Sequence, residues 1–162
     1  MKAVIDTCTI IDGLIRGYKE PKYIIQKLKK GDFNLLMTDE MAKELNIAVY
    51  MIIEKAKNSP KQKVQFNPKK YLRAVSVFSL NATKVKTHTK ITSCNDLEDN
   101  MILECAIDGK ADYCISSDSS IYDFKNYSDN ETELEWVKDI KIFHPIQYVL
   151  HEQKQHVKTT GV

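Results

Sequence analysis

The chain has 162 residues, of which 43% are hydrophobic, and its formal net charge is only +2. This length suits one ordinary domain, the composition excludes a low-complexity chain, and the charge alone identifies no nucleic-acid binder. No apolar run approaches the roughly 20 residues of a membrane helix, and no basic leader precedes the first apolar segment, so we expect a cytoplasmic protein without membrane contact.

The first elements are short. The apolar run at 2–6 has no helical length and predicts a buried strand. A short helix is expected to follow it and to end near Gly17. The next helix is framed by Pro21 near its start and Gly31 just past its end, which is typical helix punctuation. A second apolar run predicts a strand at 33–38.

The segment 38–58 has the clearest helical pattern. Thr38 is the expected N-cap, and Asp39 and Glu40 follow in the first turn, where the helix dipole favours acids. Apolar side chains that recur at helical spacing predict its buried stripe, namely Met41, Leu45, Ala48 and Ile52. Another helix is expected to start near Pro68.

The second half of the chain continues the alternation of helices and strands. The segment 81–94 is ambiguous between strand and loop, a helix is expected over 96–108, and an apolar run predicts a strand at 111–116. A short turn or helix should follow at 119–124.

The C-terminal part is expected to begin with an exposed polar excursion, up to residue 139. A last strand at 140–145 and a short helix to about His151 should complete the domain, which we place at 1–151. Residues 152–162 have no apolar periodicity and predict a flexible tail. Strands that alternate with helices predict an α/β fold with three layers, α/β/α, around a central, mostly parallel sheet.

Acidic residues follow two of the predicted strands. Asp6 and Asp118 each terminate a strand, and open parallel sheets bind ligands beyond the carboxyl ends of their strands. Glu44 borders the buried stripe of its helix, and Asp99 lies in the first turn of the 96–108 helix. Four carboxylates in one pocket would repel each other, and a divalent cation such as Mg²⁺ or Mn²⁺ would remove that cost.

Each acid also has a purely structural interpretation. Asp6 and Asp118 are suited to hydrogen-bond the backbone of a turn, and Asp99 is suited to a capping box with Asp96. Glu44 is compatible with a solvated helix position. If one of the four acids lies elsewhere, Asp123 is the first substitute.

The motifs together resemble those of PIN-domain nucleases, in particular the bacterial and archaeal toxin-like members. "VIDTC" resembles the first motif, and "TDEMAKEL" the second. "NDLEDNMILECAIDGKADYCISSD" resembles the third and fourth motifs run together, and "IKIFHPIQYV" the closing strand and helix. The third stretch is the most specific, because it joins two acids through a helix and a strand at the spacing usual in the family.

The resemblance implies a metal-dependent endoribonuclease with Mg²⁺ or Mn²⁺ as cofactor. It implies a catalytic site of four acids, namely Asp6, Glu44, Asp99 and Asp118. Asp6, Asp99 and Asp118 would be the metal ligands, and Glu44 would ligate or orient the attacking water. Thr7 and Ser116 match hydroxyl positions that support the acids by hydrogen bonds. The implied partners are an RNA substrate, a cognate antitoxin protein and a second copy of the chain.

The sequence also departs from the family pattern. Cys8 replaces the asparagine that usually follows D-T, and Ser117 replaces the glycine before Asp118. The alternative is therefore a catalytically weak or inactive PIN-like module that binds RNA or a protein. A haloacid-dehalogenase-type phosphatase fits poorly, because it needs a second aspartate where Cys8 stands.

The charge distribution is uneven in a way that suits an RNA substrate. Residues 55–90 contain ten lysines and arginines and no acids, whereas residues 96–139 contain thirteen acids and three lysines. Lysines of the first segment would contact RNA phosphates, with an affinity that falls with salt. A solvated lysine-rich face is the other interpretation of this segment.

Overall fold

A computed structural model gives the fold of residues 1–58 and 67–160. Five strands of the described chain form one sheet in the order β3-β2-β1-β4-β5, and every pairing is parallel. The strands are β1 (Lys2–Ile5), β2 (Asn34–Met37), β3 (Thr83–Lys84), β4 (Tyr113–Ile115) and β5 (Lys141–Phe143). The predicted parallel α/β fold is therefore confirmed, and the ambiguous segment 81–94 contributes only the two residues of β3.

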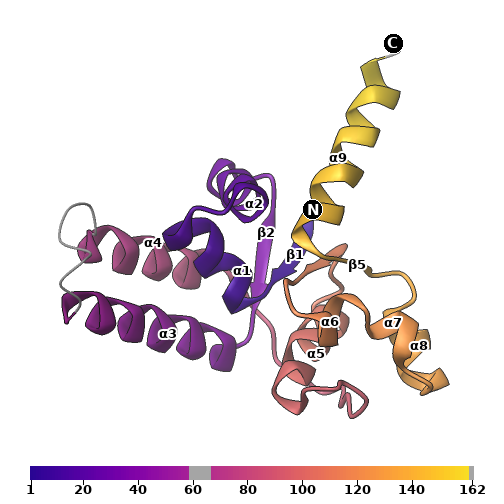
Figure 1. Cartoon of the computed structure of the whole chain (residues 1–162). Coiled ribbons are helices and arrows are strands. Elements are labelled where there is room, and N and C mark those ends of the chain that lie inside the picture. The colour runs from indigo at the N-terminus through magenta and orange to yellow at the C-terminus, as the bar shows by residue number, and fades with distance from the viewer. Residues whose placement is uncertain (59–66, 161–162) are drawn as a thin grey trace.

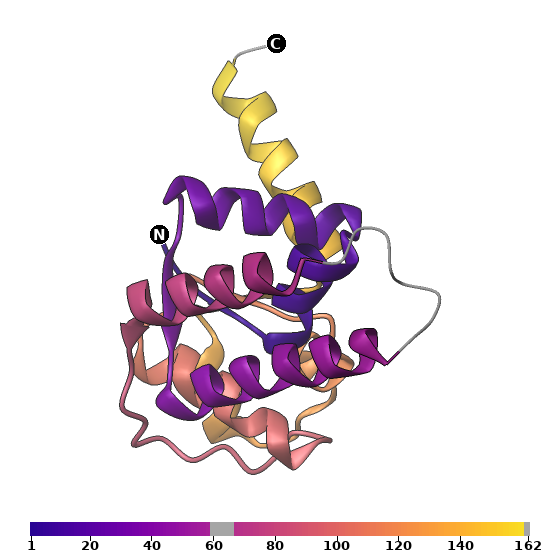
Figure 2. The same ribbon diagram turned by 90° about the vertical axis from the view of Figure 1, so that its left-hand side faces the viewer.

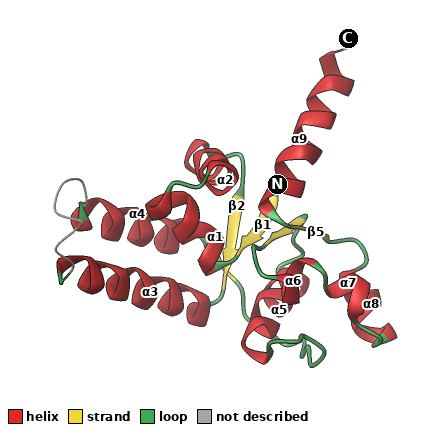
Figure 3. Ribbon diagram, viewed as in Figure 1, coloured by secondary structure: helices red, strands yellow, loops and turns green. Residues whose placement is uncertain are grey.

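One layer of helices lies in the connections that lead from β1 to β2 and on to β3. It comprises α1 (Thr7–Ile11), the π-helical turn η1 (Asp12–Arg16), α2 (Lys19–Lys30), α3 (Asp39–Lys57) and α4 (Pro68–Asn81). Both connections move in the same direction along the sheet, and right-handed crossovers place such helices on the same face. Figure 3 shows α2, α3 and α4 gathered on one side of the strands.

The other face is covered by the helices of the return path from β3 to β4 and β5. They are the 3₁₀ turn η2 (Leu97–Asp99), α5 (Asn100–Asp108), α6 (Ser119–Tyr122), α7 (Phe124–Tyr127) and α8 (Glu131–Val137). Helix α5 packs against β1, β2 and β4, and Figure 1 shows α5 and α6 beside each other on this side. The last helix, α9 (Pro145–Thr160), packs against α2.

The central strands are buried on both faces because helices cover both. Ala3, Val4 and Ile5 of β1 are fully buried, as are Cys114 and Ile115 of β4. Continuous apolar runs of this kind are typical of parallel strands between two helical layers. These two strands form the rigid centre from which the acids project.

The order in which the chain adds strands to the sheet reverses at β1. From β1 the chain proceeds to β2 on one side, whereas β4 lies on the other side of β1. Ile5 is paired with Ile115, and the backbone N–H of Asp6 donates to the carbonyl of Ile115 at 3.1 Å. Such a switch point is where open α/β sheets bind ligands, and it lies directly beneath Asp6.

Local signals for the helix ends are accurate. The Thr38 hydroxyl accepts a hydrogen bond from the backbone N–H of Met41 and caps α3. Gly31 ends α2 with a φ of 80°, a left-handed conformation that glycine adopts without strain. The buried stripe of α3 differs in part from the prediction, because Val49 and Ile53 are buried while Ala48 and Ile52 are only half-buried.

Two expectations for the C-terminal part need correction. The excursion at 126–139 is exposed only in part, because it contains the end of α7 and all of α8 and buries Glu133, whose carboxylate accepts hydrogen bonds from Thr92 and Ser93. Helix α9 does not end near His151 but continues to Thr160.

The continuation of α9 is anchored by an ion pair. Glu152 is 5% exposed, and its carboxylate forms an ion pair with the Lys27 ammonium of α2. The end of α9 nevertheless projects beyond the other elements, as both views show (Figures 1 and 2). The described chain contains no helix with the length and apolar character that membrane crossing requires.

Candidate active site

A cavity of about 370 Å³ lies at the carboxyl ends of β1 and β4. Its walls include the four acids singled out from the sequence, Asp6, Glu44, Asp99 and Asp118, together with Thr7, Cys8, Asp96, Glu98, Met101 and Ile102. Six of these ten residues are acids, and none is a lysine, arginine or histidine. We call this cavity the acidic pocket. It combines segments that are more than 110 residues apart in sequence.

Asp6 is the most deeply buried acid of the pocket, with 5% of its surface exposed. It ends β1 and is the N-cap of α1, where its Oδ1 atom accepts a hydrogen bond from the backbone N–H of Thr9. Its Oδ2 atom accepts hydrogen bonds from the Ser116 hydroxyl and from the backbone N–H of Ser117, the latter at 3.1 Å. The carboxylate is thus held by partners from α1 and from the segment that follows β4.

Ser116 connects Asp6 to Asp118. Its hydroxyl donates to Asp6 and accepts a hydrogen bond of 2.9 Å from the backbone N–H of Asp118. Asp118 is the N-cap of the short helix α6, and its side chain is more exposed than that of Asp6. The serine fully buried after β4 therefore fixes the position of one acid relative to the other.

Asp99 lies at the junction of η2 and α5, as the sequence predicts for the start of this helix. Its Oδ2 atom accepts a hydrogen bond from the Ser120 hydroxyl. The same hydroxyl lies 2.9 Å from Oδ1 of Asp118. One serine oxygen thus stands between the two acids, which brings them within about 6 Å of each other, since each is within hydrogen-bond reach of it.

Glu44 reaches the acidic pocket from the second turn of α3. Its carboxylate accepts a hydrogen bond from the side chain of Thr7, a residue that is itself buried. Thr7 therefore supports Glu44, whereas Ser116 supports Asp6. Asp123 does not line the pocket, and its Oδ1 atom accepts a hydrogen bond from Asn126 at 3.0 Å.

The acids share one electrostatic environment. Burial raises the pKa of Asp6 above its ordinary value, although its hydrogen bonds act in the opposite direction. Burial also raises the pKa of Glu44, and the charges of Asp6 and Asp99 add to this effect. For Asp99, burial raises the pKa and the charge of Asp118 contributes. Neighbouring carboxylates therefore make Glu44 and Asp99 harder to ionise.

The acidic pocket offers carboxylate oxygens to a divalent ion, but its acids are not arranged around a common point. Among the described residues, no three His, Cys, Asp or Glu side chains converge closely enough to hold one as they stand. Serine hydroxyls and backbone N–H groups contact both oxygens of Asp6, Oδ2 of Asp99 and Oδ1 of Asp118. The donor set itself suits Mg²⁺ or Mn²⁺, because carboxylate oxygens are hard ligands. An ion that bridges Asp99 and Asp118 through the oxygens that face Ser120 would displace its hydroxyl.

Several residues of this site were missed in the sequence. Ser120 carries no motif signal, because only the fold brings its hydroxyl to Asp99, 21 positions earlier. Glu98 lines the acidic pocket next to Asp99. Its position in the first turn of the predicted 96–108 helix, beside Asp99, is the sequence signal that could have identified it. Thr9 and Ser117 hydrogen-bond each other across the switch point at 3.1 Å between their hydroxyl oxygens.

Cys8 also lines the acidic pocket and is exposed. Burial of its sulfur raises the thiol pKa, and the charge of Asp6 raises it further. Because a thiolate is the reactive form of cysteine, a thiol with a raised pKa is a poor nucleophile near neutral pH. The chemistry of the pocket therefore belongs to its carboxylates.

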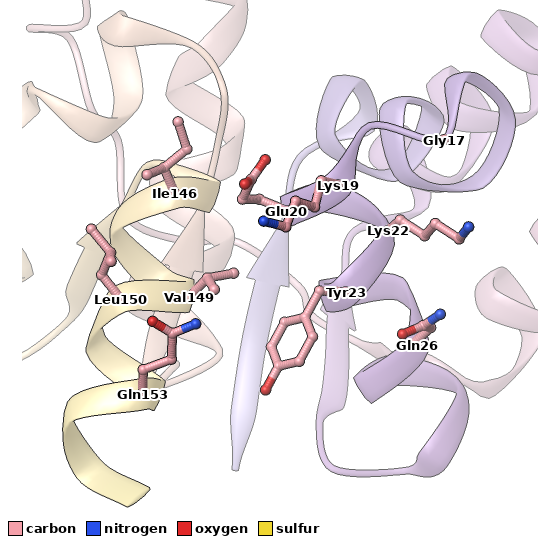
Figure 4. A pocket seen from close by; sticks show the side chains of 10 residues that line it. All are labelled: Gly17, Lys19, Glu20, Lys22, Tyr23, Gln26, Ile146, Val149, Leu150 and Gln153. Carbon is pink, nitrogen blue, oxygen red and sulfur yellow. The ribbon is translucent and has the colours of Figure 1, made fainter. Parts of the chain in front are cut away.

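A larger cavity, of about 660 Å³, lies between α2 and α9 (Figure 4). Figure 4 shows the Tyr23 ring on one side and the apolar side chains of Val149 and Leu150 on the other. Glu20 is its one acidic lining residue, and none of the predicted site residues is part of it. It therefore offers no cluster of carboxylates like that of the acidic pocket.

Comparison with known proteins agrees with the fold. The family model described as PIN domain matches residues 2–120, a range that contains all four predicted acids. Neither the curated proteins nor the solved structures gave a significant match. The family match covers well over half of the chain. The chain belongs to the PIN domain family.

Proposed function

We propose that this protein is a divalent-metal-dependent endoribonuclease whose active site is the acidic pocket. PIN domains are generally nucleases, which supports the coarser assignment as an enzyme that cleaves nucleic acid. The observation that carries the finer proposal is the meeting of Asp6, Glu44, Asp99 and Asp118 from separate segments in one pocket without a lysine, arginine or histidine in its lining. Such an excess of negative charge is suited to cation binding.

The proposed reaction is hydrolysis of a phosphodiester bond. Asp6, Asp99 and Asp118 would hold Mg²⁺ or Mn²⁺, which supplies a Lewis acid for activating water and offsetting charge on the phosphate. Glu44 would accept the proton of the attacking water, a role that its raised pKa favours. The water oxygen bonds to phosphorus while the bond from phosphorus to the 3′ oxygen breaks, and the leaving 3′ oxygen takes up a proton from solvent. The products therefore carry a 5′ phosphate and a 3′ hydroxyl.

The substrate needs positive charge that the pocket itself does not provide. Exposed cations gather where α3 ends and α4 begins, namely Lys55, Lys69, Lys70 and Arg73. Eleven residues separate Glu44 from Lys55 on α3, which corresponds to roughly 16 Å of helix. An RNA that reaches both would bind with an affinity that falls as salt rises. Residues 59–66, which include two further lysines of the basic segment, lie outside the described residues.

The proposal is tested by incubating the purified protein with a mixed RNA pool in Mn²⁺ and in EDTA. We expect cleavage in Mn²⁺ alone, and we expect Asp6→Asn to reduce the rate by at least about 100-fold, since even supporting residues of metal sites cost 10–100-fold. Asp123→Asn is the matched control, because it removes a carboxylate outside the acidic pocket. Equal rates for the two variants, or cleavage that persists in EDTA, would contradict the proposal.

A PIN-like module that binds RNA or protein without cleaving it is the second candidate. Cys8 supports it, because a thiol on the pocket wall replaces the polar asparagine of related sequences. Intact RNA under every metal condition, together with retained RNA binding, would favour this candidate over the enzyme.

We also propose that the protein acts as the toxin of a toxin–antitoxin pair. The resemblance to toxin-like members supports this role, as does an apolar surface on α3 where Ile47, Tyr50 and Met51 are each more than half exposed. Expression in cells should arrest growth, and a neighbouring gene should restore it. Size-exclusion chromatography of the protein alone distinguishes a second copy of the chain from an antitoxin as the occupant of that surface.

A further inference from the structure

Ser120 occupies an unusual position between two acids of the acidic pocket. It is 4% exposed, and both its backbone N–H and its hydroxyl lie 2.9 Å from Oδ1 of Asp118. The hydroxyl also donates to Oδ2 of Asp99. A serine hydroxyl has a single hydrogen, so it bonds one carboxylate at a time while remaining in contact with the other.

The backbone on both sides of this contact is tied together. The Tyr127 hydroxyl donates to the carbonyl of Ser120 at 2.5 Å and accepts a hydrogen bond of 3.2 Å from the backbone N–H of Asn95. Asn95 lies just before the turn that carries Asp99. The turn before α5 is therefore fastened to α6 through Tyr127, and the Ser120 hydroxyl closes the same junction on the side of the acidic pocket.

We infer that Ser120 is a positioning residue that holds Asp99 and Asp118 together in the metal-free protein and gives way when a divalent ion takes their oxygens. This inference rests on the proposed metal-dependent function. Without a positive charge, a hydrogen bond from the hydroxyl is what offsets the crowding of these two carboxylates. Oδ2 of Asp99 and Oδ1 of Asp118 are the oxygens that face each other across the Ser120 hydroxyl. An ion that bridges the two acids through these oxygens takes the place of the hydroxyl, so the two compete.

Ser120 differs in this respect from its neighbour on the same helix. Ser119 is exposed, and no side-chain contact with an acid of the pocket is seen for it. Ser119→Ala is therefore the matched control for Ser120→Ala, and Ser120→Thr tests whether the hydroxyl is what matters.

The first experiment measures unfolding by urea in EDTA. We expect Ser120→Ala to raise the unfolding equilibrium constant about tenfold, the scale of a hydrogen bond to a charged group. The same change should have a smaller effect in a protein that already carries Asp99→Asn, because one of the two charged partners of the hydroxyl is gone. Equal effects in the two backgrounds would show that Ser120 does not hold Asp99 and would overturn the inference.

The second experiment measures Mn²⁺ binding at fixed pH by calorimetry, without any RNA. We expect Ser120→Ala to bind Mn²⁺ about tenfold more tightly than the wild type, because the competing hydroxyl is absent. Ser120→Thr and Ser119→Ala should bind like the wild type. Unchanged or weaker binding by Ser120→Ala would overturn the competition and indicate that the hydroxyl helps to hold the ion.

The two experiments separate failure of this inference from failure of the proposed function. A wild-type protein that does not bind Mn²⁺ would refute the metal-dependent enzyme and with it the exchange of hydroxyl for ion. The coupling between Ser120 and Asp99 in EDTA would still decide whether the serine positions the acid.

Discussion

The carboxyl groups of Asp6, Glu44 and Asp99 are each harder to ionise in the folded protein than in water, and burial is the main cause. An acid whose pKa is raised by folding binds more protons in the folded state than in the unfolded state, at pH values between its two pKa values. In that window the folded state loses stability as the pH rises. The acidic pocket therefore destabilises the metal-free protein near neutral pH.

This leads to a prediction for Asp6, whose unperturbed pKa is 3.8. In EDTA, its contribution to the free energy of unfolding should be lost as the pH rises from about 4 through the folded pKa. Asp6→Asn cannot titrate, so its free energy of unfolding should depend less steeply on pH than that of the wild type. Urea unfolding between about pH 4 and 7 measures the slopes. Asp123→Asn should keep the wild-type slope, and identical slopes for all three proteins would refute this account.

At the scale of single residues, the sequence predicts the acids better than their supports. Asp6 and Asp118 could be found because parallel strands end at a common edge, and Asp99 because it follows a cap. The hydrogen bond from Ser120 to Asp99 could not be found, because it depends on the packing of α6 against η2. Nor could the sequence tell that Thr7 supports Glu44 while Ser116 supports Asp6.

At the scale of elements, α8 shows how a polar sequence can be part of the core. Glu133 is 2% exposed, and its carboxylate accepts three hydrogen bonds from the segment after β3, two from Thr92 and one from Ser93. Burial acts to raise the pKa of Glu133, but these hydrogen bonds outweigh it and lower the pKa. The carboxylate thus fastens α8 to an irregular segment that the sequence leaves ambiguous.

We expect Glu133→Gln to lower the free energy of unfolding by about 1–3 kcal/mol, because a neutral amide replaces a charged acceptor of three hydrogen bonds. The stabilisation from Glu133 is present above its unperturbed pKa of 4.5 and is lost as the pH falls through the lower folded value. Denaturation at neutral and at acidic pH tests both points. Glu131→Gln, an exposed change on the same helix, should have an effect within about 0.5 kcal/mol.

At the scale of the whole molecule, the layers could be predicted but the strand order could not. Alternation of apolar runs and helical periodicity indicates a parallel sheet between helices, because each pattern is local. The order β3-β2-β1-β4-β5 depends on which strands pair, and no local pattern encodes that. The same limitation explains the error in α9, since Glu152 owes its burial to Lys27, 125 positions away.

The anchoring of α9 predicts the effect of shortening the chain. A protein that ends at His151 loses Glu152 and leaves Lys27, whose side chain is only 13% exposed, without this partner. We expect the free energy of unfolding to fall by about 2 kcal/mol, less than the 3–5 kcal/mol of a fully buried pair, because Asp32 remains 3.8 Å from the Lys27 ammonium.

Urea unfolding of two shortened proteins measures this effect. A protein that ends at Gln155 keeps Glu152 and should retain wild-type stability. Equal stability of both shortened proteins would show that the ion pair does not anchor α9. At a temperature where both shortened proteins remain folded, their rate of RNA cleavage should equal that of the wild type. The reason is that the acidic pocket contains no residue of α9.

The exposure of Cys8 has a practical consequence. The chain's three other sulfhydryls, at 94, 105 and 114, are buried, so a maleimide dye should attach at one place only. That place is the rim of the acidic pocket, and the raised pKa of the thiol means that conjugation will speed up in mildly alkaline buffer. A fluorescent dye can therefore be attached at Cys8 without an engineered cysteine. Its emission intensity would report the binding of a cation or an oligonucleotide at the acidic pocket.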